Sequence, residues 1–181
     1  MAASVLLIVG DKEGTQQKAL LQRVIEKASA IQPGKVPGKL GPVIDEQSMT
    51  KIFGYIEKSE KEGATILLDG QSWMSQMENT KGNWIGPTVI LHENKTDMAM
   101  NEEVFGPVLS VYNVSTWQEA IAIENDNPFG NDAAIYTTNG GHADWLMKRV
   151  RGIIRTIWLV GAFFTSLPLL TYKYIHSINV A

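Results

Sequence analysis

The chain has 181 residues, of which 44% are hydrophobic, and a formal net charge of −3 at pH 7. This length and apolar content suit a globular protein with a substantial core. The small negative charge provides no basic patch for nucleic acid. The absence of cysteine excludes a disulfide scaffold and a cysteine-based zinc site, and it favours an intracellular, cytoplasmic protein.

The first part of the chain alternates strand-like and helix-like segments. A continuous apolar run from Ser4 to Val9 has the length of a buried strand. Two later segments carry apolar residues at helical spacing, and the second ends at Gly63, as a glycine C-cap would require. We therefore predict strands over 4–9 and 65–68, helices over 15–31 and 46–62, and a proline- and glycine-rich loop over 32–41.

The same alternation continues to about residue 150. Residues 69–83 are polar, and we predict that they are irregular and exposed. Thr116 and Glu119 have the spacing of a capping box, which opens a helix through residue 125. We also predict strands over 88–91, 108–114 and 132–137, and a helix over 142–150. Strands separated by helices predict an α/β fold with a mostly parallel sheet covered by helices on both faces.

One short segment combines adjacent carboxylates with an aromatic residue before a Gly-Pro turn. It reads Asn101-Glu102-Glu103-Val104-Phe105-Gly106-Pro107-Val108. One carboxylate of such a pair can accept hydrogen bonds from both hydroxyls of a ribose, and the aromatic ring can lie against a flat ring. By spacing alone, we favour the simpler interpretation, an acidic turn that leads into a strand.

The segment resembles the Glu-Glu-Ile-Phe-Gly-Pro-Val signature of NAD(P)-dependent aldehyde dehydrogenases. Other motifs of that family follow in the family's order, and several ordered matches are more specific than one. They are Gly41-Pro42-Val43, Lys51-Ile52-Phe53-Gly54, Glu62-Gly63-Ala64, Gly86-Pro87-Thr88 and Asn127-Pro128-Phe129-Gly130. The chain is most similar to the CoA-acylating methylmalonate-semialdehyde branch of the family.

The resemblance implies a partial aldehyde dehydrogenase catalytic domain that uses NAD to oxidise an aldehyde, with methylmalonate semialdehyde giving propionyl-CoA. Carried over from the family, Glu103 would contact the nicotinamide ribose and Phe105 the nicotinamide ring. Without the resemblance, Glu103 reads as a solvated or capping acid and Phe105 as a core residue. The intact family implies an aldehyde, coenzyme A and further copies of the same chain as partners, but no nucleic acid and no membrane.

The resemblance also implies what these residues lack. The family attacks the aldehyde with a cysteine thiolate, a strong nucleophile even when only partly ionised. That cysteine would lie immediately before Met1, and the Rossmann-type cofactor domain, the oxyanion-hole asparagine and the general base would lie further upstream. We therefore expect no catalytic residue in this chain and no oxidation by it alone. We interpret His92, His142 and His176 as isolated surface or structural residues with no carboxylate at ligand spacing, and we predict no metal site.

The tail departs from the family after Gly152, where a Gly-Ile-Asn-Val strand would be expected. We divide the chain into residues 1–152, the partial catalytic domain, and residues 153–181, a divergent apolar tail. No charged residue lies between Arg155 and Lys173, which is near the lower length limit of a transmembrane helix. We favour a shifted reading frame in a broken gene. Two alternatives stay open: a non-catalytic protein that pairs with a full-length relative, and a tail-anchored membrane protein.

Overall fold

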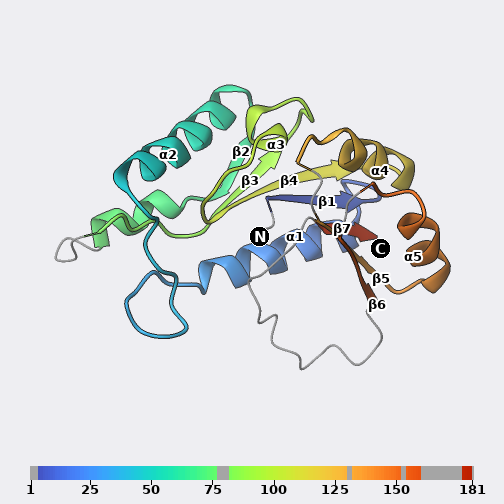
Figure 1. Cartoon of the computed structure of the whole chain (residues 1–181), viewed down its shortest axis with the longest axis horizontal. Helices are drawn as coiled ribbons and strands as arrows, with labels where there is room; N and C mark the ends of the chain where they lie inside the picture. Colours follow the sequence, from blue (N-terminus) through green and yellow to red (C-terminus); the bar gives the residue numbers. More distant parts are fainter. Residues whose placement is uncertain (1–3, 77–81, 130–131, 152–153, 160–176, 181) are drawn as a thin grey trace. The chain divides into compact units, whose positions relative to one another are not determined.

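A computed structural model describes residues 4–76, 82–129, 132–151, 154–159 and 177–180 (Figure 1). The chain forms two compact units. Unit 1 comprises Met1–Lys18 and Tyr112–Ala181, and unit 2 comprises Ala19–Val111. Helix α1 (Thr15–Ser29) begins in unit 1 and continues into unit 2, and strand β4 (Val108–Val114) runs from unit 2 into unit 1.

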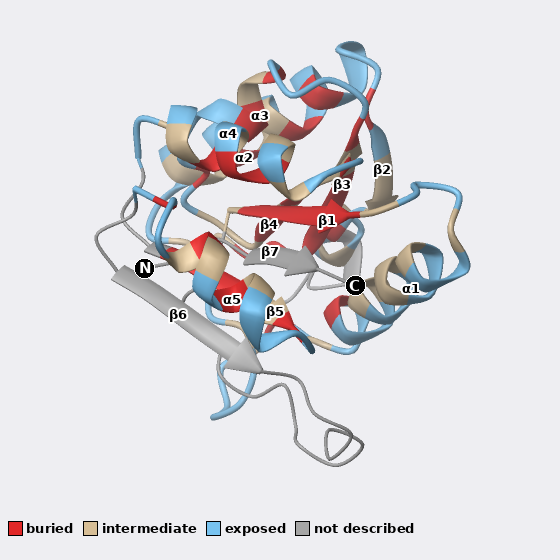
Figure 2. Cartoon of the chain, turned by 90° about the vertical axis from the view of Figure 1, so that its right-hand side faces the viewer, coloured by how far each residue is buried: buried red, intermediate tan, exposed pale blue. Residues whose placement is uncertain are grey.

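Unit 1 is built on parallel strands. Its further elements are β1 (Val5–Val9), α4 (Trp117–Asp126), β5 (Asp132–Thr137), α5 (Gly140–Met147), β6 (Ile154–Leu159) and β7 (Ser177–Val180). The strands follow the order β1-β7-β5-β6, and each of the three pairs is parallel. Ile178 of β7 is the partner of both Leu7 and Ile135. All five residues of β1 are buried, as the red ribbon in Figure 2 shows, which explains its uninterrupted apolar sequence.

Unit 2 packs a long helix against a smaller group of strands. Its elements are α2 (Glu46–Lys61), β2 (Thr65–Leu68), the 3-10 helix η1 (Gly70–Gln76), β3 (Thr88–His92) and α3 (Met98–Asn101). Strands β2 and β3 pair antiparallel, and β3 also lies beside β4. The core cluster consists of Ile52, Ile56, Ala64, Ile85, Ile90, Ala99, Val104 and Val108.

Side-chain caps fix where the helices begin. Asp45 accepts a hydrogen bond of 2.7 Å from the Ser48 amide at the start of α2. At α4, Thr116 accepts from the Glu119 amide at 3.2 Å, while the Glu119 carboxylate accepts from the Ser115 amide at 3.0 Å. The capping box predicted at α4 is therefore confirmed, with the glutamate reaching one residue further back than the usual box.

The α/β fold with a parallel-dominated sheet and helices is confirmed, and most elements fall where the sequence predicted them. Residues 69–83 are not irregular throughout, since Gly70–Gln76 form η1. The short helix α3 was not predicted, and α5 begins two residues earlier than expected and ends at Met147.

The tail holds two strands that the sequence did not predict, β6 and β7. Most of its uncharged stretch, residues 160–172, lies outside the described residues. Among the helices that the structure describes, none has the length and apolar character needed to cross a membrane.

Candidate functional site

The Glu102–Pro107 loop connects α3 to β4, and backbone hydrogen bonds fix both of its ends. The Glu102 amide donates to the Met98 carbonyl at 3.0 Å, so Glu102 closes α3. The Pro107 carbonyl accepts from the Thr88 amide at 2.7 Å, which attaches the other end to β3. The loop is thus held at its two ends by separate elements of unit 2.

The loop buries one side chain and exposes its neighbours. Glu102 closes α3 with extended backbone angles, φ −119° and ψ 155°, and its side chain is exposed. Val104 is only 4% exposed and belongs to the core cluster, whereas Glu103 is exposed and Phe105 is 78% exposed. The Gly106 amide donates to the Val104 carbonyl at 2.9 Å, so the chain turns at Phe105. Glu103 and Phe105 are therefore both presented to solvent on either side of a buried residue.

Gly106 allows this loop to approach α2 closely. A Cβ atom on Gly106 would lie 2.4 Å from Cδ1 of Ile52, a core residue that is 2% exposed. Only a residue without a side chain fits there without displacing Ile52. The glycine of the Gly-Pro turn therefore sets the distance between the loop and the helix.

The two adjacent carboxylates have different environments. The Tyr55 hydroxyl on α2 donates a hydrogen bond of 2.6 Å to Oε2 of Glu102. This bond to Glu102, assisted by partial burial, raises the pKa of Tyr55 to about 12. Within the described residues, no hydrogen bond or ion pair engages the Glu103 carboxylate. Glu102 therefore has a structural partner, and Glu103 remains available to a ligand.

A buried pair holds the start of α3. Nδ1 of His92 lies 2.9 Å from Oδ2 of Asp97, and these side chains are 0% and 3% exposed. The expectation that His92 is isolated is therefore wrong, because β3 and the turn after it bring the Asp97 carboxylate back onto the ring. The reading of His92 as structural holds, and the described residues contain no group of three or more possible metal ligands.

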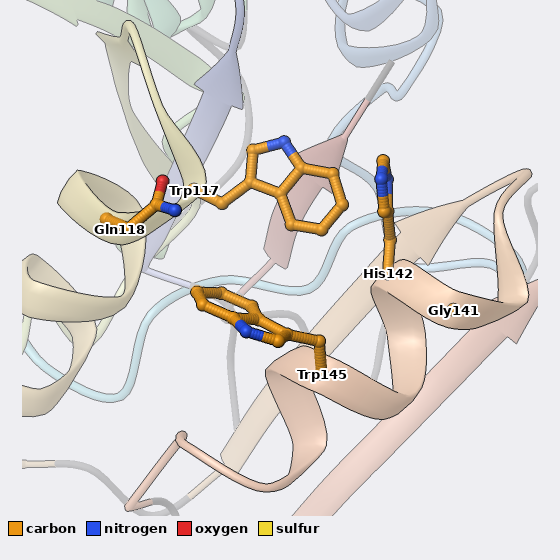
Figure 3. Close-up of a pocket in the computed structure, with 5 residues that line it drawn as sticks. All are labelled: Trp117, Gln118, Gly141, His142 and Trp145. Carbon is orange, nitrogen blue, oxygen red and sulfur yellow. The ribbon is translucent and has the colours of Figure 1, made fainter.

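Unit 1 contains a separate shallow groove of about 380 Å³, lined by Trp117, Gln118, Gly141, His142 and Trp145 (Figure 3). His142 packs edge-on against Trp117, and Trp117 against Trp145 at 6.0 Å between ring centroids. The Arg149 guanidinium lies 4.3 Å from the Trp145 ring centre. These rings pack α4 against α5, so His142 is also structural, while His176 lies outside the described residues.

The exposed side chains of Glu103 and Phe105 suit the nicotinamide end of NAD. An unpaired, exposed carboxylate can accept hydrogen bonds from ribose hydroxyls, and an exposed ring offers a face to a flat heterocycle. The family motif selected Glu103 and Phe105, whereas residue spacing alone does not distinguish Glu102 from Glu103. The Tyr55 contact that separates them joins residues 47 positions apart, so local spacing does not reveal it.

Comparison with known proteins identifies the family. The model of the aldehyde dehydrogenase family matches residues 1–158. A mitochondrial acylating methylmalonate-semialdehyde/malonate-semialdehyde dehydrogenase from Bos taurus is 42% identical over 147 residues, which are 79% of this chain and 26% of the relative. Malonate-semialdehyde dehydrogenase 1 of Geobacillus thermodenitrificans is 41% identical over 146 residues, 78% of this chain and 29% of the relative.

Solved structures agree with this assignment. The methylmalonate-semialdehyde dehydrogenase of Oceanimonas doudoroffii superposes with a TM-score of 0.76 at 31% identity, covering 86% of this chain and 32% of that one. An NAD+ complex of a Bacillus cereus aldehyde dehydrogenase shares the fold, with a TM-score of 0.72 at 22% identity over 84% of this chain and 30% of that one. The chain spans about a quarter to a third of the length of these relatives. The chain belongs to the aldehyde dehydrogenase family.

Proposed function

We propose that this chain supplies the nicotinamide-side contact of an NAD-dependent aldehyde dehydrogenase. Glu103 accepts hydrogen bonds from the nicotinamide ribose, and Phe105 lies against the nicotinamide ring. The observation that carries the proposal is the exposure of both side chains on a loop whose ends are anchored. NAD, when bound, supplies the acceptor for the hydride that leaves the substrate.

The division of roles in the loop follows from its contacts. Glu102 and Val104 anchor the backbone to α2 and to the core, so that Glu103 and Phe105 are presented with little freedom. A contact group that is already ordered loses less conformational entropy on binding. The loop therefore orients the ribose and ring rather than taking part in proton transfer.

The proposed reaction is the oxidation of methylmalonate semialdehyde by NAD, with loss of its carboxylate as carbon dioxide and transfer of the remaining three-carbon acyl group to coenzyme A, giving propionyl-CoA and NADH. Support comes from the relatives at 42% and 41% identity, whose names specify semialdehyde dehydrogenases, and in the bovine case an acylating one. We also propose, from the family resemblance, that the chain assembles into a homo-oligomer.

These 181 residues contain no cysteine, and we propose that on their own they oxidise no aldehyde. Without a thiolate, the covalent adduct from which the hydride leaves cannot form. NAD binding by the chain alone should also be weak, because one ribose and one ring contact must offset at least about 4 kcal/mol of lost translational and rotational freedom.

Two measurements test the proposal. NADH formation from acetaldehyde, propanal and methylmalonate semialdehyde, with and without coenzyme A, should not exceed a heat-treated control. Titration of the 15N-labelled chain with millimolar NAD should shift the amide signals of Glu103 and Phe105, and the Glu103→Gln variant should lose most of that shift. Turnover that depends on Glu103, or micromolar NAD affinity, would contradict the assignment of roles.

The alternative of a non-catalytic partner for a full-length relative has one observation in its favour. Ile44 is 90% exposed and Phe105 is 78% exposed, and an interface could cover such side chains. Co-purification of the chain with a full-length enzyme, lost on Phe105→Ser, would support this alternative.

The cellular compartment is a separate proposal. We propose the cytoplasm, whereas the animal relatives at 41–42% identity are named as mitochondrial. Fractionation of cells that express the chain at its natural level distinguishes the two compartments.

A further inference from the structure

The hydroxyl of Tyr55, on helix α2, bonds the Glu102–Pro107 loop, which we call the contact loop, and can hold its start in place. Tyr55 is on α2, and its side chain packs partly buried against the core cluster. Its hydroxyl reaches Glu102 at 2.6 Å, across a sequence separation of 47 residues. The ring is thus fixed by packing, while the hydroxyl makes one directed bond to the loop.

Glu103 lies between two anchored neighbours. On one side, Glu102 is bonded through its side chain to Tyr55 and through its amide to Met98. On the other side, Val104 is buried in the core. If the Tyr55 bond is removed, the Glu102 side chain is released to solvent. The backbone before Glu103 is then held by the Glu102 amide and by the Asn101 side chain, which donates to the Lys95 and Asp97 carbonyls at 2.8 and 3.0 Å.

These remaining bonds belong to a very short helix. Helix α3 has four residues, and its N-cap residue Asp97 makes no side-chain cap because its carboxylate is used by His92. A single turn of helix is marginal without tertiary contacts. The end of α3 that bears Glu102 therefore depends on contacts outside the helix.

We infer that Tyr55 is a positioning residue for the cofactor contact: by bonding Glu102 to α2, its hydroxyl fixes the direction in which Glu103 and Phe105 project. This inference rests on the proposed function for the role of Glu103, although the positioning itself is measurable without any ligand. Within the motif, Glu102 then orients the loop and Glu103 contacts the ribose, so the two adjacent glutamates are not interchangeable.

Tyr55→Phe is a suitable variant because it keeps the packed ring and removes only the hydroxyl. Backbone 15N relaxation of the full chain should give the Glu103 amide an order parameter of about 0.85 in the parent and below about 0.6 in Tyr55→Phe. Glu102→Gln keeps an acceptor but weakens the bond, and it should give an intermediate value. The amides of α2 should not change in either variant, which separates positioning from loss of structure.

A second readout follows the hydroxyl itself. The ultraviolet difference spectrum between the parent and Tyr55→Phe isolates the titration of Tyr55, which should occur near pH 12 rather than 10.0, because the hydrogen bond to Glu102 raises the pKa of Tyr55. Titration near pH 10, or an unchanged Glu103 order parameter in Tyr55→Phe, overturns the inference.

NAD titration tests the proposed function separately from the relaxation and ultraviolet measurements. In the parent chain, absence of any NAD-dependent shift at Glu103 and Phe105 contradicts the proposed function, not the positioning by Tyr55. If NAD does produce the shift, Tyr55→Phe should reduce the apparent affinity by about 2- to 5-fold, as expected for one modest hydrogen bond. If Tyr55→Phe changes the order parameter of the Glu103 amide but leaves the affinity for NAD unchanged, then Tyr55 positions the loop but does not contribute to cofactor binding, and that part of the inference is refuted.

Discussion

Removal of His92 should strongly destabilise unit 2. His92→Ala leaves the Asp97 carboxylate in a site where the side chain is 3% exposed, without the ring that lies 2.9 Å away. Breaking a buried pair in this way costs about 3–5 kcal/mol. A domain of this kind has a total stability of about 5–15 kcal/mol, so the variant should lose a large share of it.

Urea unfolding of the full chain, followed by circular dichroism, measures the loss. His92→Asn supplies an amide donor at a similar reach and should lose less than His92→Ala. The double variant His92→Ala/Asp97→Ala removes both partners and should be more stable than the sum of the two single losses predicts. If His92→Ala, His92→Asn and the parent all unfold within about 0.5 kcal/mol of one another, the pair does not hold the start of α3.

Three further predictions address the contact loop and the tail. Gly106→Ala should cost about 1–3 kcal/mol in urea unfolding, because its Cβ would meet Ile52; the matched Gly54→Ala, whose Cβ would meet nothing within 4 Å, should instead stabilise α2 by about 0.5–1 kcal/mol. The pKa of Tyr55 is raised from 10.0 to about 12, so its contribution to stability is complete below pH 10 and is lost as the pH rises through about 12; Tyr55→Phe should abolish this part of the pH dependence, and an unchanged slope would refute it. Deletion of residues 153–181 removes β7 from between β1 and β5, so unit 1 should lose cooperative unfolding; a soluble, cooperatively folded deletion protein would support a tail of unrelated sequence.

The elements that the sequence predicted well are those with local signals. Asp45 and Thr116 are good N-caps, and the first turns that follow them fix the starts of α2 and α4. The strand β1 is apolar throughout because it is buried throughout. These features depend on residues near in sequence, so a reader of the sequence alone can find them.

What the sequence did not predict depends on partners that are distant in the chain. Helix α3 is too short for a periodic pattern, and its side-chain contacts come from Glu62, 36 residues away, and Ser110, 11 residues away. Strand β6 is defined by its parallel pairing with β5, which the sequence does not reveal.

Strand β7, Ser177–Val180, did carry a sequence signal that was not used. Its Ile178-Asn179-Val180 segment repeats the last three residues of the Gly-Ile-Asn-Val strand expected after Gly152.

The sequence predicted which residues form the candidate site but not how they are arranged in space. Glu103 and Phe105 were selected through the family motif, and both side chains are exposed in the structure. Nothing local in the motif indicates that Tyr55 engages Glu102, and this contact gives the adjacent carboxylates different environments.

The most direct test of the account is a chimera in which residues 1–158 replace the matching segment of the bovine acylating enzyme, the region that the family model covers. With the bovine residues supplying the remaining parts, the chimera should reduce NAD in the presence of methylmalonate semialdehyde and coenzyme A. Glu103→Gln in the chimera should raise the KM for NAD or lower kcat, whereas the matched surface change Glu57→Gln should do neither. A folded chimera whose NAD kinetics do not respond to Glu103→Gln would contradict the central claim that this chain carries the nicotinamide-ribose contact.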